Sequence, residues 1–174
     1  MSRTLVFSAL LLLVACKSGA DQPDNSASAA APAQVSLLPL AIRTATADHR
    51  FAVEVASTPQ EQARGLMFRK QIGPDSGMLF PMTPPRTASF WMKDTLIPLD
   101  ILFIRTDGTI ALIGANRQPY ALEPVSAGVP VAAVLELAGG RAAALGIGEG
   151  DKVRWGRCAD PAGRPAALEF CPTP

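Results

Sequence analysis

Histidine is almost missing from this sequence: His49 is the only one among 174 residues. Zinc hydrolases and serine hydrolases usually need histidine, as a metal ligand or as a general base. His49 borders a segment without sustained hydrophobic periodicity, where a solvated side chain is expected. The lack of histidine therefore argues against acyl transfer and zinc binding; the favoured prediction is no metal site, and nothing in the sequence calls for a cofactor.

Long runs of basic residues are also missing. The chain has 16 Lys and Arg against 15 Asp and Glu, for a net charge of +1, so it lacks the electrostatic footprint of a nucleic-acid-binding protein. No glycine-rich phosphate loop follows any expected strand. These absences argue against a nucleic-acid partner and against a parallel nucleotide-binding sheet.

The N-terminus has the features of an export signal. Arg3 precedes an apolar run from Leu5 to Ala15 that is shorter than the roughly 20 residues of a membrane span. Leu13 to Cys16 resembles the site cut by lipoprotein signal peptidase, although an ordinary signal peptide with a chance cysteine is the alternative. We predict a signal peptide over residues 1–15, lipid on Cys16 and a periplasmic protein anchored to a membrane. Because Lys17 replaces the aspartate of the common inner-membrane retention signal, the outer membrane is favoured.

Cysteines are few, and no Cys-x-x-Cys is present, which argues against a thiol-disulfide enzyme. In an oxidising compartment the remaining thiols usually pair. We therefore predict a disulfide between Cys158 and Cys171 that closes a C-terminal tail over residues 157–174.

A linker and one domain are expected between these ends. Residues 16–48 are rich in Ala, Ser, Pro and Asp, which suits a flexible tether. Within this stretch, residues 35–42 are more apolar and form either an edge strand or a surface segment. The domain itself is predicted over residues 49–156.

Short strands dominate the expected elements of this domain. A capping box from Thr58 to Glu61 begins a short helix that should reach about Met67, and a second short helix is expected over 139–145. Asp107-Gly108 predicts a hairpin turn. Strands are expected at 50–56, 77–80, 87–93, 97–105, 109–113, 131–137 and 152–155. This pattern predicts a mainly β protein, a jelly-roll-like antiparallel β-sandwich or partly closed barrel with two short helices.

Two kinds of chemistry remain open. A pair of carboxylates drawn from Glu54, Asp94, Asp100 and Glu136 could hydrolyse glycosides if the fold placed two of them across a cleft. Methionines at positions 67, 78, 82 and 92 offer soft ligands for Cu(I), but their apolar neighbours favour packing in a core.

The segment FWMKDTLIPLDILFIR, residues 90–105, combines charges with a strongly apolar run. Alternation places Trp91 and Lys93 on one face and Phe90 and Met92 on the other; further on, Asp100, Leu102 and Ile104 share a face opposite Leu99, Ile101 and Phe103. A buried carboxylate at Asp100 needs a cation or several donors. Arg64, Arg69 and Lys93 are the expected partners. The group is either a structural ion pair or part of a pocket formed with Trp91.

The motifs RGLMFR at 64–69 and FWMKDTLIPLDI at 90–101 resemble those of the domain of unknown function 192 family over about residues 50–155. The resemblance implies a jelly-roll-like β-sandwich, often in an exported or lipid-anchored protein, and implies no particular activity. The family commonly has Asn where this chain has Asp94, and of the two side chains only the amide can donate a hydrogen bond.

The function expected from the sequence is that of a lipid-anchored periplasmic binding module without catalysis. Its partner would be a small molecule or an envelope protein, and its candidate ligand-binding residues are Arg64, Trp91, Lys93, Asp94 and Asp100. The alternatives are an envelope carbohydrate hydrolase that uses carboxylates, and a structural or chaperone-like envelope module with a flat apolar face.

Overall fold

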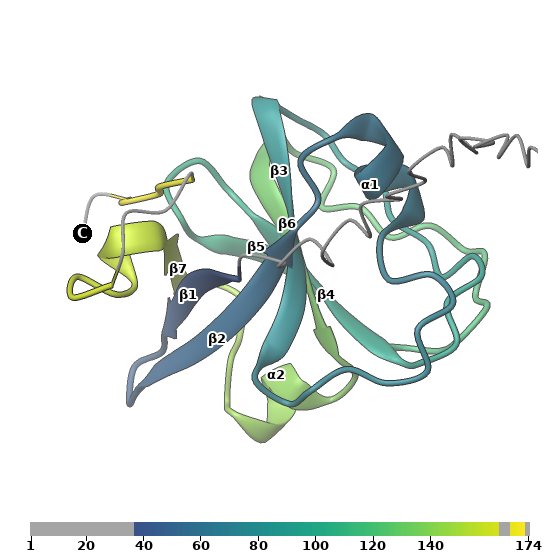
Figure 1. Cartoon of the computed structure of the whole chain (residues 1–174), viewed down its shortest axis with the longest axis horizontal. Helices are drawn as coiled ribbons and strands as arrows, with labels where there is room; N and C mark the ends of the chain where they lie inside the picture. Colours follow the sequence, from purple (N-terminus) through teal and green to yellow (C-terminus); the bar gives the residue numbers. More distant parts are fainter. Residues whose placement is uncertain (1–36, 164–167, 173–174) are drawn as a thin grey trace, which may run out of the picture. The chain divides into compact units, whose positions relative to one another are not determined.

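The structure, a computed structural model, describes residues 37–163 and 168–172. The predicted signal peptide, Cys16 and most of the predicted linker lie outside the described residues. Within them, no helix is long and apolar enough to cross a membrane. The described chain forms one seven-stranded sheet with two short helices and a 3-10 turn (Figure 1). The elements are β1 Leu38–Arg43, β2 Asp48–Val55, α1 Pro59–Arg64, β3 Ser76–Arg86, β4 Leu99–Ile104, β5 Ile110–Arg117, β6 Val131–Ala138, α2 Arg141–Ala144, β7 Lys152–Trp155 and η1 Gly156–Cys158.

The sheet has the order β5-β4-β6-β3-β2-β1-β7. All neighbours are antiparallel except β2 and β3, which run parallel. The two edge strands meet at one corner, where Thr109 bridges Lys152 and the Ile110 amide donates to the Asp151 carbonyl at 2.9 Å. The sheet is therefore a partly closed barrel, which confirms the predicted fold class.

Both faces of the central strands are buried, which creates two separate cores. Leu102 and Ile104 of β4 belong to the core enclosed by the curved sheet. Leu99, Ile101 and Phe103 belong to the second core on the opposite face, as the alternation predicted. The second core is covered by α1 and by two long loops. Met78, Met82 and Met92 are buried in it, so these methionines pack as apolar side chains.

Three sequence predictions need correction. The sheet begins at Leu38, inside the predicted linker, because the apolar β1 pairs with both β2 and β7; β1 is therefore not an edge strand. Strand β3 does not end at Pro81 but continues to Arg86 through an irregularity in its register. Residues 87–93 form no ladder: they make a single bridge, between Phe90 and Val125, although side chains along them still alternate between buried and exposed.

Helix α1 begins as predicted and ends early. Thr58 accepts a hydrogen bond from the Glu61 amide, and the Glu61 carboxylate accepts from the Ser57 and Thr58 amides at 2.8 Å. Gly65 follows the last helical residue with φ +48°, a conformation that L-residues rarely adopt. The helix therefore stops at Arg64 instead of reaching Met67.

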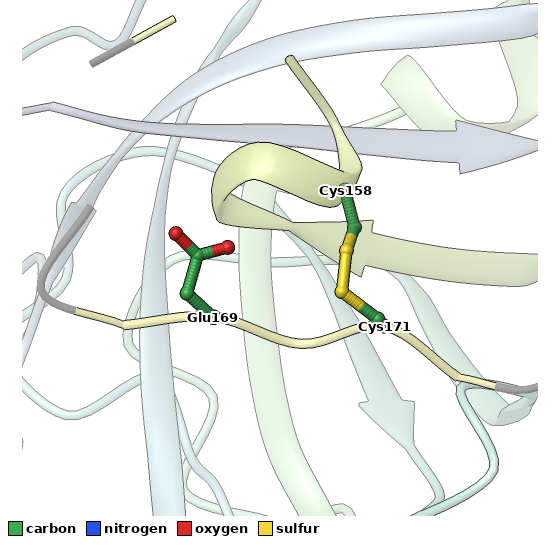
Figure 2. A group of neighbouring side chains, drawn as sticks. All are labelled: Cys158, Glu169 and Cys171. Carbon is green, nitrogen blue, oxygen red and sulfur yellow. A yellow bond between two sulfur atoms is a disulfide. The ribbon is translucent and has the colours of Figure 1, made fainter. Parts of the chain in front are cut away.

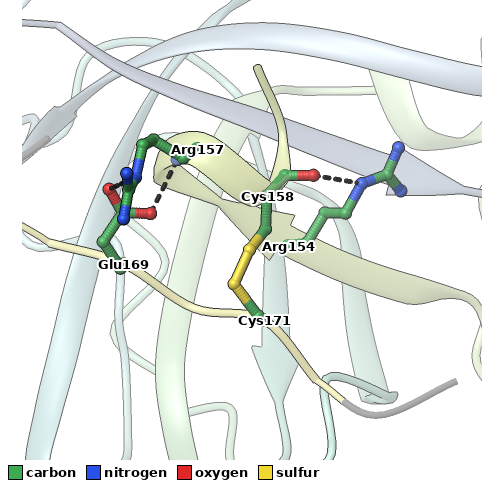
Figure 3. Close-up of a disulfide and its surroundings, with 5 residues drawn as sticks. All are labelled: Arg154, Arg157, Cys158, Glu169 and Cys171. Carbon is green, nitrogen blue, oxygen red and sulfur yellow. Dashed lines mark hydrogen bonds and ion pairs between the residues drawn. A yellow bond between two sulfur atoms is a disulfide. The ribbon is translucent and has the colours of Figure 1, made fainter. Parts of the chain in front are cut away.

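The C-terminal segment is fastened to β7. Cys158 and Cys171 form the predicted disulfide, with Cα atoms 5.5 Å apart (Figure 2). Phe170 stacks on Trp155 with ring centroids 4.1 Å apart. Glu169 accepts a hydrogen bond from the Arg157 amide at 2.7 Å, and the Cys158 carbonyl accepts one from Arg154 at 2.8 Å (Figure 3). The two cysteines are thus joined by a covalent bond, and Glu169 adds a hydrogen bond and an ion pair to Arg157. Together these contacts attach the C-terminal segment to η1 and β7.

Replacing both Cys158 and Cys171 by Ser should lower the free energy of unfolding by about 3 kcal/mol, because closing a loop of roughly this size restricts the unfolded chain. Equilibrium denaturation of the oxidised wild type and the double variant measures this loss. The matched control is Arg157→Ala, which removes only a surface ion pair at 3.5 Å and should cost less than about 1 kcal/mol. A double variant as stable as this control would contradict the prediction.

Candidate functional site

A cavity of about 570 Å³ opens over the second core. Its walls come from α1 and the turn after it, from the far end of β3 and from the loop over residues 87–95. This volume is in the range of pockets that hold small molecules. The lining residues are Gln62, Ala63, Arg64, Gly65, Leu66, Met67, Phe80, Met82, Arg86, Thr87, Ala88, Ser89, Phe90, Trp91, Lys93, Thr95 and Glu136.

Glu136 forms the floor of this cavity. It lies in the middle of β6, paired with Met78 of β3 on one side and Ile101 of β4 on the other. Only 5% of the residue is exposed, and its Oε2 atom has no hydrogen-bond partner among the described residues. A Cβ atom on Gly65 would stand 3.9 Å from this oxygen, so the turn after α1 covers the carboxyl group.

Burial raises the pKa of Glu136 to about 8, from an ordinary value of 4.5. The cause is loss of hydration alone, because a carboxylate in apolar surroundings is far less stable than the neutral acid. No cation counteracts the shift. At neutral pH the floor of the cavity therefore presents mainly a protonated carboxyl group, which can donate one hydrogen bond and accept others.

Three cations surround the mouth of the cavity. Arg64 comes from α1, Arg86 from the end of β3 and Lys93 from the covering loop, and all three are exposed. Within the described chain, the ion pairs involve other basic residues, and none includes these three. Glu61, on α1, is occupied by the capping box. In the part of the chain that the structure describes, the mouth therefore carries three cations that form no ion pair with a carboxylate.

Trp91 shares this mouth with the cations, whereas the exposed Phe68 and Tyr120 are outside the cavity lining. Trp91 is 51% exposed, and the Lys93 ammonium lies 6.0 Å from the centre of its ring. Phe68 and Tyr120 are both 60% exposed and stand on neighbouring loops, since the Phe68 amide donates to the Asp94 carbonyl and the Tyr120 amide to the Thr95 carbonyl. The mouth thus offers flat apolar surface next to positive charge.

Three of the five predicted ligand-binding residues come together in this cavity, namely Arg64, Trp91 and Lys93. Asp94 is not among its lining residues. It adopts φ +51°, in the left-handed region that Asn and Asp tolerate better than most residues. Its carbonyl accepts from the Phe68 amide at 2.9 Å, so Asp94 forms a turn that ties the loop after α1 to the covering loop. An Asn or an Asp suits that backbone role equally well.

Asp94→Asn should therefore keep the wild-type melting temperature, whereas Asp94→Val should cost about 1–2 kcal/mol, because a β-branched side chain disfavours positive φ. Thermal unfolding measures both. Ser89→Val is the matched control, since Ser89 is exposed in the same loop and its φ is not positive. Equal stability of Asp94→Val and Ser89→Val would contradict the assignment of Asp94 to the turn.

Asp100 is buried as predicted, but its partners are not Arg64, Arg69 or Lys93. One carboxylate oxygen accepts from the amides of Asn116 and Gly140 at 2.7 and 3.0 Å, and the other accepts from Ala142 at 2.8 Å. Three backbone N–H groups thus replace the cation that sequence reasoning expected. Arg69 instead holds Glu54 with two bonds of 2.5 and 2.6 Å. Asp100 fastens α2 and the end of β5 to β4.

The carboxylate pair required for glycoside hydrolysis is not assembled in the cavity. In the ladder between β4 and β6, Asp100 is opposite Leu137, and Ile101 is opposite Glu136. The two carboxyl groups therefore project from opposite faces of the sheet. Of the four acids considered from the sequence, only Glu136 lines this cavity.

Sequence reasoning gave too little weight to Glu136 and did not select Arg86. The sequence did contain a signal for Glu136, because it is the one charged residue in the apolar strand VAAVLEL, 131–137. Asp100 stands out in its own strand in the same way. Arg86 had no comparable signal, because its place at the mouth depends on β3 continuing through Pro81, Pro84 and Pro85.

The fold and the cavity define a small, partly closed β-barrel with a ligand-sized pocket over a buried acid, Glu136, which forms no ion pair among the described residues. Residues 41–155 match the model of DUF192, described as an uncharacterized ACR family, and the chain belongs to this family. No curated protein is significantly similar to the chain.

Two crystal structures share the fold. One, a protein of unknown function from Novosphingobium aromaticivorans, is 47% identical with a TM-score of 0.67, and the match covers 68% of this chain and 85% of that one. The other, from Sinorhizobium meliloti and described as a candidate transcription regulator, is 39% identical with a TM-score of 0.67 and coverage of 70% and 95%.

Proposed function

We propose that this protein is a binding module that holds a small organic molecule in the cavity over Glu136. The observation that carries the proposal is the buried Oε2 atom of Glu136 in the cavity lining, which has no hydrogen-bond partner among the described residues. Burying a polar group without a hydrogen bond costs free energy, and a ligand that bonds to Glu136 would recover part of that cost. The cations and the Trp91 ring at the cavity mouth would orient the bound molecule.

Other partners have less support. The description of the Sinorhizobium relative suggests a nucleic-acid role. Such a role would need a broad basic surface, whereas the net charge of this chain is +1. A hydrolase with two carboxylates would need a second acid in the cavity. A chaperone-like module or protein partner would use a flat apolar face, whereas the exposed Trp91 lines a concave site.

Native mass spectrometry of the full chain, purified from its own host, tests the proposal. Wild type should carry an added mass below about 1 kDa that is lost when the protein is denatured, which separates a bound molecule of pocket size from covalent lipid. Ser89→Trp should lose this mass because the larger side chain enters the cavity mouth. Ala143→Trp, on the exposed face of α2, is the matched control and should keep it. The proposal fails if wild type carries no added mass and its melting temperature does not rise with the low-molecular-weight fraction of host extract.

The site of action is proposed to be the bacterial envelope, with the protein lipidated at Cys16 and facing the periplasm. The apolar run of residues 5–15, the sequence from Leu13 to Cys16 and the Cys158–Cys171 disulfide support an exported protein, because disulfides persist in oxidising compartments. Palmitate labelling should mark wild type and not Cys16→Ser. Unlabelled wild type would contradict lipidation, and recovery in the inner membrane would contradict the outer-membrane assignment.

A further inference from the structure

We infer that the ligand of this cavity is a small organic anion, whose negative group contacts Arg64, Arg86 and Lys93 while its uncharged end hydrogen-bonds to Glu136. This inference rests on the proposed function and specifies the chemical class of the ligand.

Charge at the cavity mouth is the first argument. Most basic residues elsewhere, such as Arg69, Arg141 and Arg154, are compensated by a carboxylate within the described chain. Arg64 and Lys93 have no such partner there, and Arg86 makes only a hydrogen bond to the neutral Gln62 at 3.3 Å. Three exposed cations from three different segments converge on one opening. A carboxylate or phosphate would find bidentate donors in the two guanidinium groups.

The cavity floor supplies the second argument. A carboxylate ligand could not approach an ionised Glu136 without repulsion. The structure avoids this conflict, because Glu136 lies between Met78 and Ile101 with burial favouring its neutral form. A neutral acid donates to a carbonyl or hydroxyl oxygen. The cavity is therefore polarised, with positive charge outside and a neutral donor inside.

The wall between these ends determines the shape of the ligand. Phe80 and Phe90 pack edge to face with centroids 5.0 Å apart, and both line the cavity together with Trp91. Aromatic walls favour a flat or apolar body. The complete ligand class is thus an anion, an apolar middle and an oxygen acceptor at the far end.

Matched probes test this inference: 4-acetamidobenzoate, 4-acetamidophenyl phosphate and the neutral 4-acetamidobenzamide. All three have a flat ring and the same acetamide oxygen, and they differ in the group that would reach the cations. Titrations at pH 7 and low salt, followed by the backbone amide signals of Ser89, Thr95 and Glu136, give each affinity. At least one anion should bind 10-fold or more tightly than the amide, and 0.5 M salt should reduce this preference because salt screens exposed charges. The anion that binds more tightly shows whether the negative group of the natural ligand is a carboxylate or a phosphate.

The triple variant Arg64→Gln, Arg86→Gln, Lys93→Gln should reduce the preference to about twofold or less, because binding of the anion should weaken far more than binding of the amide. Arg105→Gln removes an exposed cation that is absent from the cavity lining, so it should preserve the preference. Equal affinity for anion and amide would overturn the anion inference while leaving the binding proposal intact. Failure of all three probes to shift these signals would overturn the inference as well, and native mass spectrometry would then decide the binding proposal separately.

Discussion

Replacing Asp100 by Ala should destabilise the domain by at least about 3 kcal/mol. The substitution leaves the amides of Asn116, Gly140 and Ala142 without their acceptor, and each unsatisfied buried donor costs about 1–3 kcal/mol. It also separates α2 from β4, so the loss should affect cooperative unfolding of the whole sheet. Urea denaturation measures the free energy of unfolding.

Asp100→Asn should have an intermediate stability. Its amide keeps one oxygen acceptor for two of the backbone donors, but its NH2 group would face the third donor. Glu123→Gln is the control, because this side chain is 85% exposed and its ion pair with Arg117 is 3.9 Å long; the change should stay within about 0.5 kcal/mol. If Asp100→Asn were as stable as this control, the backbone-anchoring role of Asp100 would be wrong.

Replacing Glu136 by Gln should stabilise the domain, by an amount that grows with pH. The unfolded chain releases the Glu136 proton near its ordinary pKa of 4.5, whereas the folded chain keeps it until about pH 8. Between these values the folded state binds more protons, so the free energy of unfolding of wild type falls as pH rises. One pKa unit corresponds to about 1.4 kcal/mol, and the folded group is half ionised at pH 8, so the gain from Glu136→Gln at that pH should be about 4 kcal/mol.

This pH dependence should be absent from the Glu136→Gln variant and present in Glu123→Gln. The charged side chains that line the cavity with Glu136 are Arg64 from α1, Arg86 from β3 and Lys93 from the covering loop. Glu136 is the one acidic side chain among the described residues that line the cavity, so the pH dependence is assigned to it. Parallel stability curves for wild type and Glu136→Gln from pH 5 to pH 8 would contradict the burial argument.

The sequence predicted the parts of the fold that depend on local chemistry. Alternation assigned Leu102 and Phe103 to opposite cores, the capping box at Thr58 located α1, and Asp107-Gly108 located the β4–β5 hairpin. The sequence-based prediction failed where pairing with distant strands determines how far a strand extends. Pro81 does not end β3, because the strand continues to Arg86 through a shift in its register with β6, and proline is tolerated at such irregularities.

The candidate site could be predicted only in part, because local patterns identify some of its residues and the fold alone brings the others together. Trp91 and Lys93 could be grouped by their spacing, whereas Arg64 was selected as an expected partner of Asp100, which the structure does not bear out. The partners of Asp100 could not be found, because backbone amides leave no trace in the sequence and only the fold brings Gly140 and Asn116 to β4. Glu136 became prominent only when both neighbouring strands and the turn at Gly65 were seen to enclose it.

The most direct test of the central claim is a carbon-13 NMR titration of the Glu136 carboxyl group, with Glu136→Gln used to assign its signal. A neutral acid at the floor of the cavity predicts a titration midpoint near pH 8. A midpoint between about 4 and 5, the ordinary range of a solvated glutamate, would mean that the group is hydrated or paired and would contradict the account of the site.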